Sequence, residues 1–226
     1  MCGRYTWKKT HNGQFRKLVK DPATPAVPSF NRAPGQSHPA ITLNCGSPTW
    51  KEMRWGNPKN EQGSGFFPIN ARSETVAEKP IFRQSFLEKR CLIPADGWFE
   101  WQVIEGQKYP HYIFSERNEV FAFAGIWTSG KETESGSSFF SVLTRSAASN
   151  ILHIHHRAPL ALTEKHWENW LKQDIDVQAL ITQTQCGQPR WSATQVSSRV
   201  NSTRNNDSSL LEVFAELLLL LLSCLH

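Results

Sequence analysis

The second residue of the chain, Cys2, has the most distinctive chemistry that the sequence offers. Removal of Met1 would leave a cysteine that carries both a free α-amine and a thiol. An α-amine with a pKa of about 7.7–8.0 is partly neutral at physiological pH and can attack an aldehyde to form an imine. The adjacent thiol can close that imine to a five-membered thiazolidine, or attack a carbonyl alone as a thiolate. A cysteine at position 2 is ordinary in most proteins, so this chemistry needs support from other residues.

Three histidines, His153, His155 and His156, lie close together in a second segment. With a spacing of two residues, His153 and His155 are expected on one face of a strand. No cysteine or aspartate pair near them would complete a metal site. The five cysteines are odd in number and include no CxxC pair, which argues against a zinc knuckle and a disulfide framework. Neither a metal ion nor a cofactor is expected, and a reducing compartment is indicated.

Five motifs occur in order along the chain. They are Met-Cys-Gly-Arg-Tyr at 1–5, Phe-Asn-Arg-Ala-Pro-Gly-Gln at 30–36, Ile-Asn-Ala-Arg-Ser-Glu-Thr at 69–75, Ala-Asp-Gly-Trp-Phe-Glu-Trp at 95–101 and Ile-His-His-Arg-Ala-Pro at 154–159. Together they resemble the SOS response-associated peptidase (SRAP) family of abasic-site processing proteins over about residues 2–212. The resemblance implies that Cys2 crosslinks covalently, as a thiazolidine, to the ring-opened sugar aldehyde of an abasic site in single-stranded DNA. Such a crosslink would shield the lesion from strand breakage in the DNA damage response.

The same resemblance assigns the groups that transfer protons. Glu100, between two tryptophans, matches the family's active-site carboxylate, and desolvation is expected to raise its pKa toward neutrality. The alternative is an exposed glutamate on a strand. Alignment on the Arg-x-Pro that follows selects His155 as the catalytic histidine, while His156 occupies a position that the family fills variably. An imidazole that titrates near neutral pH can donate a proton to the ring oxygen of the sugar as the ring opens.

Asparagines and arginines are assigned to the lesion pocket and to the DNA backbone. Asn31 and Asn70 match family asparagines that line the pocket, and Asn70 is counted with the catalytic residues. Family arginines that contact phosphates are matched by Arg4, Arg72 and Arg157. The alternatives are turn-forming asparagines, and ion pairs of the arginines with Glu74 or Asp96.

An aromatic pair, Phe66-Phe67, is the nearest candidate for the family's DNA-facing wedge. The chain departs from the family pattern after residue 56, where a polar, glycine-containing stretch replaces an apolar segment with Pro and Trp. An exposed aromatic pair suits stacking on bases. Two side chains that enter the core at a strand start are the alternative.

Three other functions remain open. A thiol-dependent peptidase would use Cys2 as its nucleophile, with Glu100 and His155 as acid and base. A glutamine amidotransferase also begins Met-Cys-Gly, but Asn12-Gly13 is the only Asn-Gly pair that could form its oxyanion hole, and it lies too near the start. A non-catalytic single-strand binding module would leave Cys2, Glu100 and His155 without a role.

The elements that must position these residues are mostly strands. Apolar runs separated by Gly, Pro and Asn predict strands at 40–43, 90–93, 112–114, 120–126, 139–143 and 160–162. Helices are predicted at 12–19, 79–89, 163–173 and 176–183. Five prolines between residues 22 and 39 predict an extended surface loop that could bind a ligand. The expected fold is a single α+β domain, a strand-rich mixed sheet or open barrel with peripheral helices.

Composition is consistent with a globular DNA-binding protein. The 226 residues have a net charge of +5, which favours anionic partners without demonstrating one. Nine tryptophans suggest aromatic surface beyond the needs of a core. Because the N-terminus has no apolar signal region, a cytoplasmic monomer that associates with damaged DNA and not with membranes is expected. Residues 213–226, with six consecutive leucines at 217–222, form an atypical leucine-rich tail after a domain of residues 2–212.

Overall fold

Strands dominate the computed structural model of the chain, which describes residues 2–8, 15–21, 27–57, 66–130, 137–185 and 188–213. A five-stranded sheet has the order β13-β8-β7-β1-β2. The larger sheet has the order β11-β10-β4-β3-β6-β9-β12, and β5 pairs with β10. Because β10 also pairs with β9, the pairings β10-β4-β3-β6-β9 return to their starting strand and form a closed ring. The predicted α+β class with a mixed, strand-rich sheet is confirmed.

The bounds of the elements are as follows. The strands are β1 (Arg4–Trp7), β2 (Ser29–Arg32), β3 (Ser37–Asn44), β4 (Ser47–Trp55), β5 (Asn70–Arg72), β6 (Arg90–Ala95), β7 (Gly97–Ile104), β8 (Gln107–Ser115), β9 (Phe121–Ser129), β10 (Ser138–Ser146), β11 (Arg157–Pro159), β12 (Ala161–Leu162) and β13 (Trp191–Gln195). The α-helices are α1 (Pro80–Glu88), α2 (Glu164–Leu171) and α3 (Val177–Gln185), and the 3₁₀ helices are η1 (Phe15–Lys17), η2 (Ser198–Asn201) and η3 (Ser208–Leu211).

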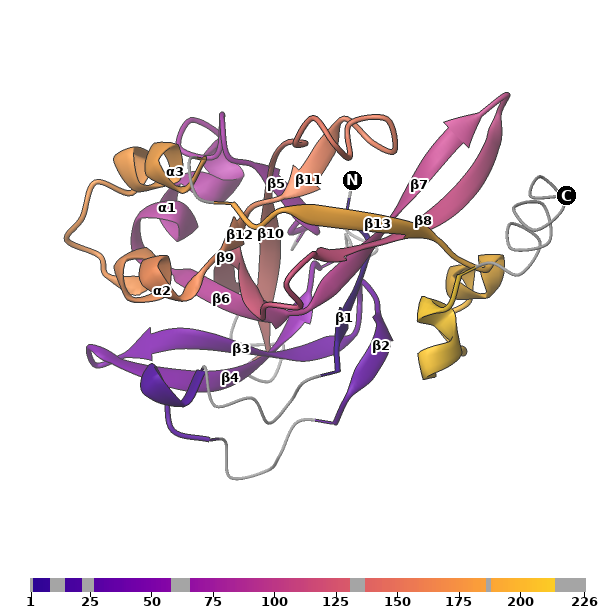
Figure 1. Cartoon of the computed structure of the whole chain (residues 1–226). Coiled ribbons are helices and arrows are strands. Elements are labelled where there is room, and N and C mark those ends of the chain that lie inside the picture. Colours follow the sequence, from indigo (N-terminus) through magenta and orange to yellow (C-terminus); the bar gives the residue numbers. More distant parts are fainter. Residues whose placement is uncertain are drawn as a thin grey trace, which may run out of the picture.

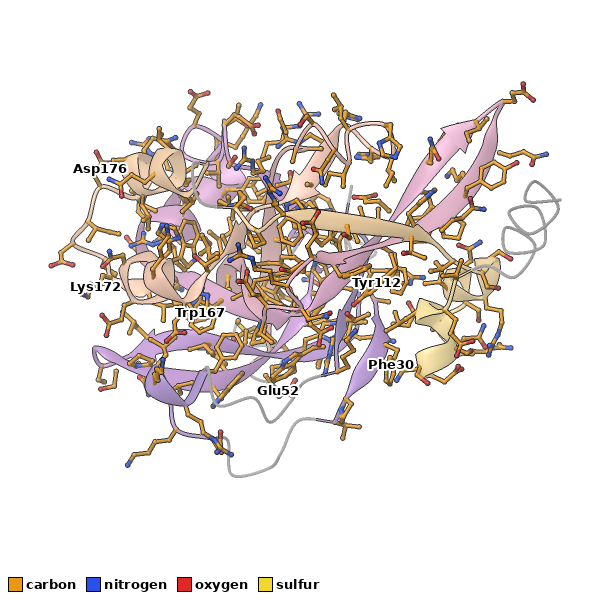
Figure 2. The ribbon with its side chains drawn as sticks, in the orientation of Figure 1. Phe30, Glu52, Tyr112, Trp167, Lys172 and Asp176 are labelled. Atoms are coloured by element: carbon orange, nitrogen blue, oxygen red, sulfur yellow. The ribbon has the colours of Figure 1, made fainter. Side chains whose placement is uncertain are left out.

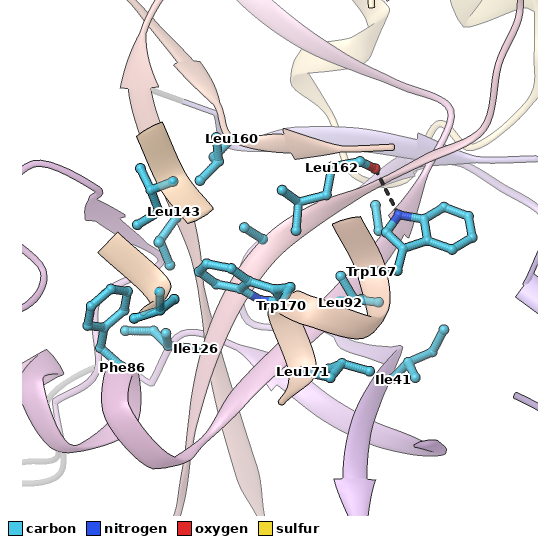
Figure 3. Close-up of a cluster of buried hydrophobic side chains, with 14 of the residues drawn as sticks. Ile41, Phe86, Leu92, Ile126, Leu143, Leu160, Leu162, Trp167, Trp170 and Leu171 are labelled. Atoms are coloured by element: carbon cyan, nitrogen blue, oxygen red, sulfur yellow. Dashed lines mark hydrogen bonds between the residues drawn. The ribbon is translucent and has the colours of Figure 1, made fainter. Parts of the chain in front are cut away.

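Two apolar cores form because successive strand residues point to opposite faces. On β9, Phe121 and Phe123 pack between the two sheets, whereas Ala122 and Ala124 face the helices. The three α-helices lie together on one side of the molecule, and the β7–β8 hairpin projects from the other side (Figure 1). The helix-side core is closed by α2 (Figure 3), where the Trp167 indole donates a 2.8 Å hydrogen bond to the Leu162 carbonyl.

The tryptophans serve the cores rather than the surface. Six of the nine are at most 5% exposed: Trp7, Trp55, Trp98, Trp167, Trp170 and Trp191. The other three, Trp50, Trp101 and Trp127, are half-buried, so the expected aromatic surface is limited to these. In the side-chain view, Trp167 lies on the helical side and Phe30 lies on the opposite side, where β2 meets the 3₁₀ segment (Figure 2).

Two predicted segments differ from the structure. The predicted helix at 12–19 is only a 3₁₀ turn, Phe15–Lys17, in its described part, and residues 12–14 lie outside the described residues. The predicted proline-rich loop contains β2 and the start of β3 in its described part. Pro39 is tolerated within β3 because β6 pairs there only with Ile41 and Thr42, which leaves that edge free at Pro39. The other predicted strands and helices overlap observed ones.

Candidate active site

The pairing of β1 with β7 brings Cys2 alongside Glu100. The two strands are antiparallel, with Arg4 opposite Phe99 and Thr6 opposite Gly97. Cys2, which is two residues before Arg4, therefore lies next to the residues that follow Phe99. Gly97 on β7 leaves room for the Tyr112 ring of the neighbouring strand β8, because a Cβ at that position would overlap this ring.

Several hydrogen bonds hold the N-terminal segment in place. The Asn70 side-chain amide on β5 donates a 2.9 Å hydrogen bond to the Cys2 carbonyl. The Arg4 guanidinium donates a 2.9 Å hydrogen bond to the Gly3 carbonyl. Cys2 itself is fully buried, and this burial, together with the Glu100 carboxylate, raises the pKa of its thiol well above the ordinary range. The thiol is therefore protonated at neutral pH.

Glu100 lies in the interior, contrary to the alternative of an exposed strand residue. It is 2% exposed, and burial raises the pKa of its carboxyl from 4.5 to about 7. At neutral pH such a group is divided between acid and carboxylate, which suits proton transfer in both directions. Opposite it on β8 lies His111, on the same face of the sheet, with a pKa lowered by burial.

A cleft of about 620 Å³ opens beside these residues. Its walls come from β1, the β7–β8 hairpin, the segment before β11 and η2, and they comprise Arg4, Glu100, Trp101, Val103, Lys108, His155 and Asn201. The Trp101 indole donates a 2.9 Å hydrogen bond to the Asn201 side chain, and the Arg4 guanidinium donates a 3.4 Å hydrogen bond to the Asn201 backbone carbonyl. Two basic side chains, Arg4 and Lys108, thus face the cleft, which favours an anionic ligand.

His155 reaches this cleft from a turn and not from a strand. Residues 149–154 form consecutive turns, with the Ile154 amide donating to the Ile151 carbonyl at 3.0 Å. The predicted shared strand face of His153 and His155 is therefore wrong. Burial lowers the pKa of His155, so that the imidazole is neutral at pH 7, and its ring stacks on His156 at 4.5 Å. Among the described residues, no group of three His, Cys, Asp or Glu side chains could hold a metal ion.

The predicted DNA-contacting arginines have different surroundings. Arg4 lines the cleft. Arg72 is exposed at the end of β5, two residues after Asn70 and so on the same face of that strand. Arg157 is 8% exposed and forms an ion pair with Glu74, as its alternative assignment foresaw. Its buried guanidinium faces protein groups, so the phosphate contact expected of Arg157 is not supported.

Asn31 also differs from its predicted role in the pocket. It is 2% exposed, and its amide donates hydrogen bonds of 3.2, 3.0 and 2.9 Å to the carbonyls of Val200, Ser202 and Asn205. These bonds anchor the 3₁₀ segment that presents Asn201 to the cleft. Asn31 therefore supports the wall of the cleft from behind.

The two phenylalanines of the candidate wedge separate. Phe67 is 4% exposed and packs against Phe82 at 5.9 Å, so its predicted contact with DNA is not supported. Phe66 is 44% exposed and lines a second, apolar cavity of about 420 Å³ that also reaches Asn70. Phe67 lines the same cavity from the buried side, and the stacking role of the exposed Phe66 stays a prediction.

Four residues of the cleft were missed by sequence reasoning: Trp101, Val103, Lys108 and Asn201. Trp101 follows Glu100 in the motif at 95–101, and Asn201 lies four residues after the Val-Ser pair at 196–197, which also resembles a late family motif. Val103 and Lys108 are cross-strand partners near the hairpin tip, and nothing in their sequence spacing marks them.

The structure thus defines an α+β protein whose second residue, Cys2, is buried beside a titratable carboxyl group at a cleft with basic side chains. The sequence model described as SOS response associated peptidase (SRAP) matches residues 1–203, and the chain belongs to this family of abasic site processing proteins. No helix within the described residues is long and apolar enough to cross a membrane.

Individual relatives agree with this assignment. The chain is 33% identical over 225 residues to the abasic site processing protein YoqW of Bacillus subtilis, which covers 94% of this chain and 99% of that protein. It is 27% identical over 185 residues to the abasic site processing protein YedK of Escherichia coli, covering 77% and 81% of the two chains. A protein from Bacteroides thetaiotaomicron, 23% identical, has the same fold with a TM-score of 0.77 over 94% of this chain and 100% of that one. A 26% identical phage-related protein from Bordetella bronchiseptica has a TM-score of 0.70 over 87% and 95%.

Proposed function

We propose that the chain, after removal of Met1, crosslinks itself through Cys2 to abasic sites in single-stranded DNA. The observation that carries this proposal is the placement of Cys2 beside Glu100, whose carboxyl has a pKa of about 7, at a cleft that also contains His155. An N-terminal aminothiol needs an aldehyde, and its condensation needs a group that both donates and accepts protons near pH 7. The named relatives are abasic site processing proteins, and the open form of an abasic sugar carries an aldehyde.

The reaction proceeds in two bond-forming steps. The Cys2 nitrogen attacks the aldehyde carbon, and the resulting hemiaminal loses water to form an imine. The thiol sulfur then adds to the imine carbon while its proton passes to the nitrogen, which closes the thiazolidine. One water is released overall and no redox partner is needed.

Proton transfers in these steps are assigned to two side chains. The His155 imidazole relays the proton of the hemiacetal hydroxyl to the sugar ring oxygen, so that the closed hemiacetal opens to the aldehyde. Protonated Glu100 assists departure of the hemiaminal hydroxyl as water, and ionised Glu100 accepts the thiol proton. Asn70 has a buried carbonyl oxygen without a hydrogen-bond partner among the described residues, which suits a hydroxyl group of the sugar.

The protonated state of the thiol favours this sequence over thiolate attack. Burial opposes formation of a thiolate at Cys2. A peptidase mechanism that begins with the thiolate would work against that opposition, whereas the imine route starts from the amine and uses the thiol second. The chain is accordingly proposed to act as a crosslinking protein with lyase-like chemistry.

Intact-mass spectrometry after incubation with an abasic single-stranded oligonucleotide tests the proposal. The expected product has the mass of the Met1-free protein plus the oligonucleotide less one water, and an undamaged oligonucleotide should give none. Cys2→Ala and Cys2→Ser retain the amine but cannot form the thiazolidine, so their adducts should survive only after borohydride reduction of the imine. Cys45→Ala, which removes an exposed thiol away from the cleft, is the matched control and should crosslink normally. A stable, unreduced adduct in Cys2→Ala would contradict the thiazolidine.

A further inference from the structure

Arg157 and Glu74 form a bidentate ion pair within the protein. The Arg157 side chain is 9% exposed, and its two terminal nitrogens donate hydrogen bonds of 2.6 and 2.8 Å to the two carboxylate oxygens of Glu74. The same guanidinium donates a 2.7 Å hydrogen bond to the Thr144 carbonyl. A bidentate arrangement of this kind fixes direction as well as distance.

The backbone of Arg157 controls the orientation of His155. The Arg157 amide donates a 2.9 Å hydrogen bond to the Nδ1 atom of His155. The Arg157 carbonyl oxygen also lies 3.0 Å from Nδ1, so the backbone of Arg157 engages this nitrogen in either tautomer of the ring: the carbonyl accepts when Nδ1 carries the proton, and the amide donates when it does not. The backbone of Arg157 therefore sets the orientation of the imidazole ring.

The ion pair also connects two parts of the cleft region. Glu74 lies just after β5, the strand on which Asn70 holds the Cys2 carbonyl. Thr144 on β10 is opposite both Arg72 of β5 and Pro159 of β11. The Glu74–Arg157 pair therefore ties the segment that holds Cys2 to the segment that holds His155.

We infer that Glu74 and Arg157 are a positioning pair that fixes the ring orientation of His155 for proton transfer. The inference rests on the proposed function of His155. Neither residue contacts the substrate in this assignment, and both act through the backbone of residues 155–157.

Glu74 offers the cleaner perturbation. Its side chain is 47% exposed, whereas removal of Arg157 would alter a buried site and threaten folding. Glu74→Gln keeps the size of the side chain and one oxygen acceptor but removes the charge and the second acceptor. Glu164→Gln is the matched control, because Glu164 forms a 3.0 Å ion pair with Lys17 on the helical side of the molecule.

The first readout is independent of activity. Long-range proton–nitrogen NMR spectra of the histidine rings distinguish the two tautomers, and His155→Ala identifies the His155 signals. The ring nitrogen shifts of His155 should be the same in the wild type and in Glu164→Gln. In Glu74→Gln they should differ from the wild-type values, because the backbone of Arg157 no longer holds the ring in one orientation. An unchanged His155 spectrum in folded Glu74→Gln would overturn the inference.

The second readout is a double-mutant cycle on the crosslinking rate. Glu74→Gln should slow crosslinking by about tenfold, within the range that a small misplacement of a reacting group produces. If Glu74 acts through His155, Glu74→Gln/His155→Ala should be no slower than His155→Ala. Multiplicative effects would show that Glu74 acts elsewhere and would also overturn the inference. Failure of the wild type to crosslink would refute the proposed function, while the NMR result would still decide the positioning role.

Discussion

Replacement of Glu100 by glutamine should make the protein more stable at high pH while slowing its reaction. The ordinary pKa of 4.5 applies to the unfolded chain, and burial raises the pKa to about 7 in the folded protein. Below pH 4.5 the carboxyl is protonated in both states and its ionisation has no effect on stability. Between pH 4.5 and 7 the unfolded chain loses the proton first, so the free energy of unfolding falls as pH rises.

The magnitude follows from the separation of the two values. At about 1.4 kcal/mol per pH unit, the difference between 4.5 and about 7 corresponds to a loss of about 3 kcal/mol by pH 8. Between pH 5 and pH 8, where the experiment is practical, about 2–3 kcal/mol of that loss remains. Glu100→Gln cannot ionise, so its free energy of unfolding should lack this pH-dependent loss. The cost of burying the glutamine amide is the same at pH 5 and pH 8, so it cancels when the unfolding free energies at the two pH values are subtracted.

Urea unfolding at pH 5 and pH 8 measures the effect. The difference in unfolding free energy between Glu100→Gln and wild type should grow by about 2–3 kcal/mol in favour of the variant from pH 5 to pH 8. Single-turnover crosslinking by the variant should be slower by about 10²–10⁴-fold, because the amide cannot exchange a proton. Glu105→Gln, at the exposed tip of the same hairpin, should change neither quantity.

Parallel stability profiles for wild type and Glu100→Gln would refute the assignment of a buried, proton-retaining carboxyl. Equal crosslinking rates, with an unchanged dependence on pH, would instead show that the cleft only positions the aldehyde and that the Cys2 aminothiol reacts unaided.

Three further predictions concern binding and packing. Arg72→Ala should weaken binding of single-stranded DNA and reduce the slope of log affinity against log salt by about 0.7, measured by fluorescence anisotropy. Phe67→Ala should lower the free energy of unfolding by about 3–5 kcal/mol, whereas Phe66→Ala should change it by less than about 0.5 kcal/mol and weaken DNA binding. Trp101→Phe removes the hydrogen bond to Asn201 and should cost about 1 kcal/mol in urea unfolding while slowing crosslinking.

The buried strands were predictable because their sequences are continuous apolar runs. Residues 120–126 and 139–143 predicted β9 and β10, and both strands have apolar side chains in the two cores. The strands β4 and β7 contain charged or polar residues at intervals, and they were not predicted. Their pairing partners supply the stabilisation that the local sequence does not show.

Several details of the cleft depend on contacts between distant residues. Trp101 and Asn201 are 100 positions apart, and their hydrogen bond follows from the packing of the 3₁₀ segment on the β7–β8 hairpin. The burial of Asn31 has the same cause, because its carbonyl acceptors lie about 170 positions away. Motif matching identified the residue types, while only the fold distinguishes Arg72, which is exposed, from Arg157, which is buried.

Burial links the stability of the cleft to its proposed chemistry. Removing Glu100 from water raises its pKa toward the working pH, and removing Cys2 from water keeps its thiol protonated. A protonated thiol is a poor nucleophile, so in the proposed mechanism it reacts only once an imine has formed beside it and Glu100 can take its proton. The proposed order of the two bond-forming steps therefore depends on the same desolvation that raises the pKa of Glu100. If this reasoning holds, a variant that exposes Glu100 to water should gain stability at pH 8 and lose crosslinking rate together, since both quantities depend on one carboxyl group.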